Sequence, residues 1–231
     1  MTTSRKRLVI FGIEDYSKLV YEYFTRDEIY EVAAFTVDRK YIKRNVVNGL
    51  PVIDFEEIET CYPPDTHEFH AAVVYGNMNR DRAGIIARAE EKGYKTASYI
   101  SPCAFVAPTV KIGKHCFIFE NNVIQDFTEI GDNCILWSGN HIGHESKIED
   151  NVFISSHVVV SGHCAIGSNC FLGVNSALAN GTTVGKESWV SHGSVLSGDI
   201  PAHSMVSAAT RSSVMALNEE ALTKALGRAK R

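Results

Sequence analysis

One feature of this sequence restricts its fold more than any other: an aliphatic residue recurs at every sixth position. From Ile100 to Leu196, each sixth residue is Ile, Leu or Val. A period of six fits neither an α-helix, with about 3.6 residues per turn, nor a lone strand, with about two. It fits a chain that turns a corner every six residues, so that three edges close a triangular coil of about 18 residues. The repeat therefore predicts a prism of stacked parallel strands.

A second column of residues supports the prism. The residues two places before each aliphatic are small or β-branched, apart from two asparagines, and a narrow interior needs such residues beside large aliphatic side chains. Four of the six cysteines stand in this column, and no pair in the chain has CxxC spacing. We therefore expect thiols that pack in the core, not metal ligands or disulfides. These four are Cys116, Cys134, Cys164 and Cys170.

Residues 1–99 alternate between strand-like and helix-like segments. Strands are expected at 8–12, 32–37, 71–76 and 96–100, and helices at 16–24, 55–59 and 80–93. This order predicts a small Rossmann-like α/β domain that binds ligands at the carboxyl ends of its parallel strands. A nucleotide-linked sugar would be held there by residues of two loops, unless these residues only cap helices in a scaffold domain. The candidates for substrate binding are Asp38, Asn77, Asn79 and Arg80.

The first loop of this domain argues against a dinucleotide cofactor. Residues 12–17 lack the GxGxxG pattern, and the acids Glu14 and Asp15 would repel a pyrophosphate. A sugar nucleotide is therefore the more plausible ligand of the domain.

Composition and segment lengths narrow the function classes. The formal net charge is −4 with mixed signs, so no basic field favours nucleic acid. The apolar run at 8–12 is too short for a signal peptide or a membrane span, and we expect a cytoplasmic protein without membrane contact. The expected fold class is α/β plus β-solenoid, with domains at 1–99 and 100–210 and a C-terminal helix within 211–231, where leucines recur at helical spacing.

A Rossmann-like domain followed by hexapeptide repeats resembles the bacterial sialic acid O-acetyltransferase / sugar O-acyltransferase family. That family includes N-acetyltransferases of nucleotide-linked amino sugars. The segments Ile142-Gly143-His144-Glu145 and Phe171-Leu172-Gly173-Val174-Asn175 carry the local resemblance, which covers nearly the whole chain. It implies a left-handed parallel β-helix, acetyl-CoA as co-substrate, and a homotrimer with the acyl-CoA cleft between neighbouring subunits.

The resemblance also implies roles for particular residues. His144 matches the family's general base and Glu145 the acid that orients it. A backbone N–H one coil later, on Gly162, would face the acyl carbonyl as oxyanion donor. Gly173 and Val174 match a segment that lines the pantetheine arm of CoA.

The chain departs from the family pattern in several places. A second family histidine falls on Phe153, and His157 is a candidate substitute; His141 is a further candidate for substrate binding. A glycine near the pantetheine becomes His192, which we place in the CoA site. Residues 207–210 replace the family's terminal Gly-x-Pro-Ala segment near the adenine. These changes suggest that the chain binds CoA differently from the family or uses another acyl donor.

Acyl transfer to an amine needs a proton acceptor, an orienting group and an oxyanion donor, which His144, Glu145 and Gly162 would supply. Glu145 stands one coil before His163, so these two side chains are also expected to stack and pair. Trp137 and Trp189 are expected to serve packing.

Three other functions compete with amine acetylation. O-acetylation of a sugar hydroxyl needs the same base and stays open. A zinc carbonic anhydrase would need two histidines about five residues apart on one chain. The sequence has no His-x4-His, so no metal is expected. A non-catalytic assembly scaffold is the third alternative.

Overall fold

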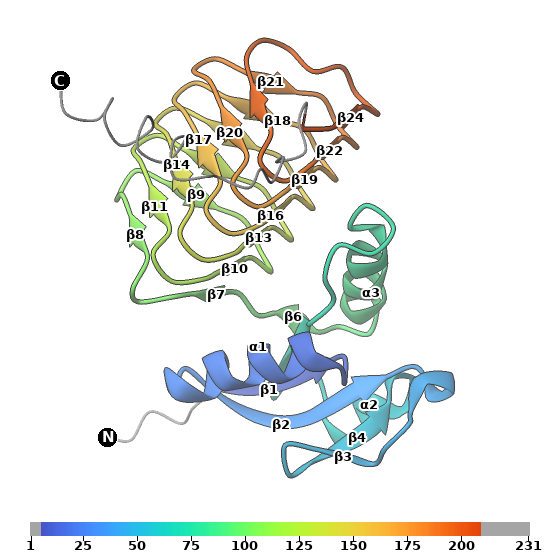
Figure 1. The fold of residues 1–231 in the computed structure, drawn as a ribbon. Helices are drawn as coiled ribbons and strands as arrows, with labels where there is room; N and C mark the ends of the chain where they lie inside the picture. Colours follow the sequence, from blue (N-terminus) through green and yellow to red (C-terminus); the bar gives the residue numbers. More distant parts are fainter. Residues whose placement is uncertain (1–5, 209–231) are drawn as a thin grey trace, which may run out of the picture.

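The computed structural model describes residues 6–208, which form a small α/β unit followed by a triangular β-helix (Figure 1). The expected fold class is confirmed: a Rossmann-like sheet with helices precedes a left-handed parallel β-helix. The helix expected within 211–231 lies outside the described residues, as do Ala209 and Thr210. Within residues 6–208, no helix has the length and apolar character to cross a membrane.

The front sheet contains six strands in the order β3-β4-β2-β1-β5-β6. β1, β2, β4, β5 and β6 are mutually parallel, and β3 is an antiparallel addition at one edge. The strands are β1 (Lys6–Phe11), β2 (Tyr30–Val37), β3 (Val46–Val47), β4 (Leu50–Asp54), β5 (His67–Ala71) and β6 (Lys95–Thr96). The helices are α1 (Asp15–Arg26), α2 (Ile58–Cys61) and α3 (Arg80–Glu91), with short 3-10 turns η1 (Arg39–Tyr41) and η2 (Phe55–Glu57).

Two details of this sheet differ from the sequence prediction. The strand expected at 71–76 lies at 67–71, because beyond Ala72 the carbonyls of Val73 and Val74 accept hydrogen bonds from Arg82 instead of a neighbouring strand. The segment at 46–54, where the sequence analysis placed no strand, is the β3–β4 hairpin. Its turn residues Asn48 and Gly49 have φ angles of 47° and 77°, the left-handed conformation that tight hairpins require.

The β-helix has three faces, which we name by the residues that point outward from them. The aromatic face contains β7 (Tyr99–Ile100), β10 (Phe117–Ile118), β13 (Ile135–Leu136), β16 (Phe153–Ile154), β19 (Phe171–Leu172), β22 (Trp189–Val190) and β24 (Met205–Val206). The aliphatic face contains β8 (Phe105–Val106), β11 (Val123–Ile124), β14 (His141–Ile142), β17 (Val159–Val160), β20 (Ala177–Leu178) and β23 (Val195–Leu196). The charged face contains β9 (Lys111–Ile112), β12 (Glu129–Ile130), β15 (Lys147–Ile148), β18 (Ala165–Ile166) and β21 (Thr183–Val184).

The period-six aliphatic column fills the prism interior, as the sequence predicted. From Ile118 to Leu196 every member of the column is buried, whereas Ile100, Val106 and Ile112 in the first coil are partly or largely accessible. The four cysteines of the second column are buried free thiols. Paired residues such as Phe117 and Ile135 align in parallel, so residues 18 apart become neighbours on adjacent coils.

The front domain covers the aromatic face and shares one core with it. Helix α1 lies against this face in Figure 1, and its Phe24 packs edge-on against Phe117 with 5.8 Å between ring centroids. Phe117 also stacks on Tyr99 at 4.7 Å. These aromatic contacts bury large surfaces with specific geometry, and they fix the front domain on the prism.

A buried polar network joins the two parts. The side chain of Arg82 on α3 is fully buried and donates to the side-chain oxygen of Asn133 (2.9 Å), to its carbonyl (3.0 Å) and to the carbonyl of Val74 (3.0 Å). Burial lowers the pKa of Arg82 to about 10. His115 bonds Asn133 at 2.8 Å and accepts from the Ala71 N–H at 2.9 Å. The end of β5 is therefore bonded to the prism.

Candidate active site

His144 stands at the corner between the aliphatic and the charged faces. Its N–H donates to the side-chain oxygen of Gln125 at 3.0 Å, and its carbonyl accepts from the N–H of His163 at 2.9 Å. Glu145 and His163 follow the corner with φ angles of 55° and 56°. The turn is therefore held by the coil below and the coil above, and the three side chains remain exposed.

The side chains of His144, Glu145 and His163 form one cluster, in which their nitrogen and oxygen atoms lie within 4.8 Å of one another. The Glu145 carboxylate pairs with His163 Nδ1 at 2.8 Å. The imidazole of His144 lies edge to face on that of His163, with 4.8 Å between centroids. Of the two expected arrangements for Glu145, the structure thus shows the pair with His163, and no hydrogen bond joins Glu145 to the ring of His144 within residues 6–208.

Gly162 lies directly against the imidazole of His144. A β-carbon on this glycine would be 2.7 Å from Nε2 of His144, closer than such contacts allow. The N–H of Gly162 is buried and has no acceptor in the part of the chain that the structure describes. A donor without a partner beside a histidine is the arrangement that an oxyanion site requires.

A groove of about 620 Å³ brings the three predicted CoA residues together. Gly173, Val174 and His192 all line it. A β-carbon on Gly173 would lie 2.5 Å from the backbone nitrogen of His192, so only glycine fits between these coils. Gly173 and Gly193 therefore leave part of the groove lining as bare backbone.

The opposite wall of the groove is aromatic, which the sequence reasoning missed. Phe153, Phe171 and Trp189 form a stack, with 5.5 Å and 3.8 Å between successive centroids. Tyr75, from the loop after β5, meets all three edge-on at 4.9–5.9 Å. Trp189, assigned to packing alone, thus also lines the groove. Aromatic residues recurring one coil apart were the signal for this wall.

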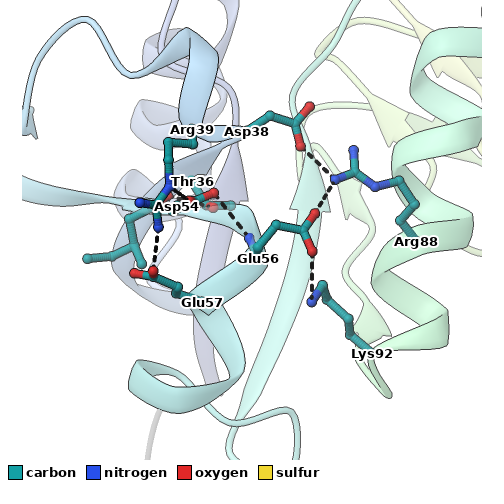
Figure 2. A network of polar contacts seen from close by, with 9 residues as sticks. Thr36, Asp38, Arg39, Asp54, Glu56, Glu57, Arg88 and Lys92 are labelled. Atoms are coloured by element: carbon teal, nitrogen blue, oxygen red, sulfur yellow. Dashed lines mark hydrogen bonds and ion pairs between the residues drawn. The ribbon is translucent and has the colours of Figure 1, made fainter.

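The front-domain residues expected to bind substrate are mostly engaged in ion pairs or in the core. Asp38 accepts from Arg88 at 2.6 Å, and Figure 2 shows Glu56 on the same guanidinium. Asn79 is fully buried and donates to the Cys170 carbonyl at 3.1 Å.

Arg80 and Asn77, the other two front-domain residues expected to bind substrate, lie in different surroundings. Arg80 forms an ion pair with Glu187 of the prism at 2.6 Å. Asn77 is exposed, and with Met78 and Asn79 it adopts three successive left-handed conformations. The loop therefore fastens α3 to the prism, while the side chains of Asn77 and Arg80 stay accessible.

His141 and His157, the two other histidines that the sequence suggested for substrate binding, lie apart from each other. His141 points outward from the aliphatic face, between Val123 and Val159 of the adjacent strands. The ring of His157 covers Gly139 at the corner nearer the groove, with Nδ1 2.5 Å from the place of a β-carbon. Neither is a member of the His144 cluster.

A second cavity lies where sequence reasoning placed a ligand, at the carboxyl ends of β1, β2 and β5. It measures about 300 Å³, and Gly12, Tyr16, Tyr41 and Lys43 are among its lining residues. A β-carbon on Gly12 would lie 2.9 Å from the Ala72 carbonyl, and its φ is 121°, so this position needs glycine. The strand ends thus border a cavity, but none of the four predicted substrate residues lines it, and the sequence reasoning did not name its tyrosines and lysine.

The aliphatic face separates the groove from the His144 cluster. Going round one coil, the groove residues Phe171 and Val174 come first, then Ala177 of the aliphatic face, then Asn180 on the corner of His144. On one chain, the groove and the His144 cluster therefore lie on opposite sides of the same face.

Two family models match the prism. The bacterial transferase hexapeptide model (six repeats) matches residues 109–144 and 127–162, and the hexapeptide repeat of succinyl-transferase matches 164–197. Among curated proteins, none matches the chain by sequence.

Solved structures resemble both parts of the chain. The acetyltransferase domain of PglB from Neisseria gonorrhoeae FA1090 is 28% identical, with a TM-score of 0.78, over 87% of this chain and 96% of that domain; it has also been solved with acetyl coenzyme A. Perosamine N-acetyltransferase from Caulobacter crescentus, solved with CoA and GDP-perosamine, is 25% identical, with a TM-score of 0.77, over 86% and 91%. WeeI from Acinetobacter baumannii AYE, at 18% identity, shares the fold, with a TM-score of 0.76 over 86% and 94%. The prism is therefore built of bacterial transferase hexapeptide repeats, both parts of the chain resemble solved sugar acetyltransferases, and the chain is an acyltransferase.

Proposed function

We propose that the protein transfers an acetyl group from acetyl-CoA to the amino group of a nucleotide-linked deoxyamino sugar. The observation that carries this proposal is the position of His144 Nε2 against Gly162, whose N–H has no acceptor within residues 6–208. A base and an oxyanion donor thus face one small space, on a prism shared with acetyltransferases.

In this mechanism the acceptor amine attacks the thioester carbon while His144 Nε2 takes its proton. The new N–C bond forms as negative charge develops on the carbonyl oxygen, which accepts a hydrogen bond from the Gly162 N–H. Collapse breaks the C–S bond, and the CoA sulfur leaves with the proton that His144 returns. Glu145 pairs with the ring of His163 and so gives it a fixed carboxylate partner. The centroid of that ring lies 4.8 Å from the centroid of the His144 ring.

The two cavities divide the substrates between them. The groove beside Gly173 and His192 suits the pantetheine arm because part of its lining is bare glycine backbone and another part is aromatic. The front-domain cavity, with Lys43 and Tyr41, suits the nucleotide of the acceptor at the strand ends. The relative solved with both CoA and GDP-perosamine supports an acceptor of this class.

We further propose a homotrimer, since the site is incomplete on one chain. The aliphatic face leaves Phe105 59% and Val195 83% exposed, with Val123 and Val159 also accessible between them. Packing three such faces around a threefold axis would bury this apolar row. It would also set the groove edge of one chain beside the His144 corner of the next.

We expect a solution mass near three times 25.5 kDa. Light scattering after size exclusion measures it directly, and the charged variant Val159→Lys in the centre of the aliphatic face should give single chains. Lys111→Ala, on the charged face, is the matched control and should remain trimeric. A wild-type mass of one chain in active protein would contradict the interfacial site.

The function itself is tested by release of free thiol from acetyl-CoA. The acceptors are UDP-, dTDP- and GDP-linked amino sugars, including GDP-perosamine. We expect one amino sugar to release thiol well above the rate without acceptor, and mass spectrometry of the product should show one added acetyl group. Release only with hydroxyl acceptors would favour O-acetylation. No release with any acceptor or acyl-CoA would favour a scaffold.

A further inference from the structure

We use the word notch for the space over Gly162 on the His144 corner, where residue 162 has no side chain and those of His144 and Asn180 approach it. A β-carbon built on Gly162 would lie 2.7 Å from His144 Nε2 and 3.1 Å from the side-chain oxygen Oδ1 of Asn180. The three residues succeed one another one coil apart on the same corner. The histidine therefore forms one wall of the notch, the glycine its floor and the asparagine the opposite wall.

Asn180 is free to meet a ligand. Its side chain is exposed, and its amide makes no hydrogen bond to any residue from 6 to 208. Buried asparagines of the same prism behave differently: Asn140 donates to the Trp137 carbonyl at 2.5 Å and accepts from the Val158 N–H at 2.8 Å. The exposed Asn180 amide has no such protein partners within residues 6–208, so it is open to solvent and to a ligand.

We infer that Asn180 selects an amine over a hydroxyl as the acceptor, an inference that rests on the proposed function. A neutral amine brings two N–H donors to the notch, whereas a hydroxyl brings one O–H. When His144 Nε2 takes one proton of the amine, Asn180 Oδ1 accepts a hydrogen bond from the other N–H. The nitrogen lone pair is then directed at the thioester carbon, whose oxygen turns to the Gly162 N–H.

The covalent step is unchanged by Asn180, which acts by positioning. The N–C bond forms, the C–S bond breaks, one proton passes from nitrogen through His144 to the CoA sulfur, and the second N–H stays on the product amide. A hydroxyl acceptor has no second proton, so it would leave the Asn180 oxygen without a donor. Sites that hydrogen-bond a substrate group discriminate strongly against analogues that lack it.

The test compares two variants on two ligands. The ligands are the amino sugar that releases thiol fastest in the acceptor panel and its counterpart with a hydroxyl in place of the amine, used as a competitive inhibitor. In Asn180→Ala we expect kcat/KM for the amine to fall about tenfold or more, while the inhibition constant of the hydroxyl counterpart changes less than about twofold. Asn180→Asp keeps an acceptor and should retain the amine rate within about threefold.

The controls separate this inference from the proposed function. Ser168→Ala changes a corner residue on another edge of the prism and should leave both constants unchanged. Asn180→Ala could weaken kcat/KM for the amine and binding of the hydroxyl counterpart equally, or weaken neither. Either result would overturn the role of Asn180. Thiol release by the wild type would still support acetyl transfer. Loss of amine turnover in Asn180→Asp as large as in Asn180→Ala would also overturn it, because the acceptor is then not what matters.

Discussion

Replacing His144 by alanine is expected to lower kcat for acetyl transfer by about 10²-fold or more, because the attacking amine loses its proton acceptor. The KM for acetyl-CoA should change little, since His144 does not line the groove that holds the predicted CoA residues. Steady-state thiol release over a range of acetyl-CoA concentrations measures both constants. Circular dichroism and solution mass would show that the variant keeps its fold and assembly.

His203→Ala is the matched control for this variant. His203 is an exposed histidine of the prism that pairs with Glu187 at 3.0 Å, away from the notch. Its replacement should leave kcat within about twofold. A His144→Ala enzyme that turns over within about threefold of the wild type would remove His144 from the mechanism and leave only binding at this corner.

Replacing Arg82 by methionine is expected to lower the free energy of unfolding by about 3 kcal/mol or more. The guanidinium donates to Asn133 and to the half-buried carbonyls of Val73 and Val74. Methionine would leave these two carbonyls and the buried Asn133 carbonyl without this donor, whereas the Asn133 side-chain oxygen would keep its bond to His115. Part of this loss is offset because a buried charge no longer needs to be desolvated. Urea unfolding at fixed protein concentration measures the change.

Arg88→Met on the same helix is the control. Arg88 pairs with Asp38 and Glu56 near the surface, where ion pairs contribute about 1 kcal/mol or less. The two substitutions are chemically identical and differ in burial. If both variants lose similar stability, the buried network does not hold the front domain on the prism.

The prism could be predicted in detail because its contacts repeat. Once the period of six was recognised, the partner of each residue followed from its number: His144 had to adjoin Gly162, and Glu145 had to adjoin His163. Stacking then selected the pair of Glu145 with His163, which the resemblance alone did not favour. Gly173, Val174 and His192 lie together for the same reason, on neighbouring coils of one corner.

The front domain could be predicted only in outline, because its contacts with the prism do not repeat. Nothing in the sequence around Asn79 or Arg80 shows that one enters the core and the other pairs with Glu187, more than a hundred positions later. One member of the aromatic lining of the groove depends on the same docking, since Tyr75 reaches it from the loop after β5. The β3–β4 hairpin was a different kind of miss: Asn48-Gly49 is a strong hairpin signal that sequence reasoning passed over.

A chain wound in this way cannot change length freely. Losing one residue between Ile100 and Leu196 would shift every later side chain by one place, turning inward aliphatics to the surface and surface residues inward. Losing one whole coil would keep every column aligned and only shorten the prism. His144, Gly162 and Asn180 come from three different coils, however. The loss of one of these three coils would therefore replace one of the residues around the notch. Coils could therefore be added or removed at the ends of such a prism, while the three coils that carry the proposed chemistry must stay together and in order.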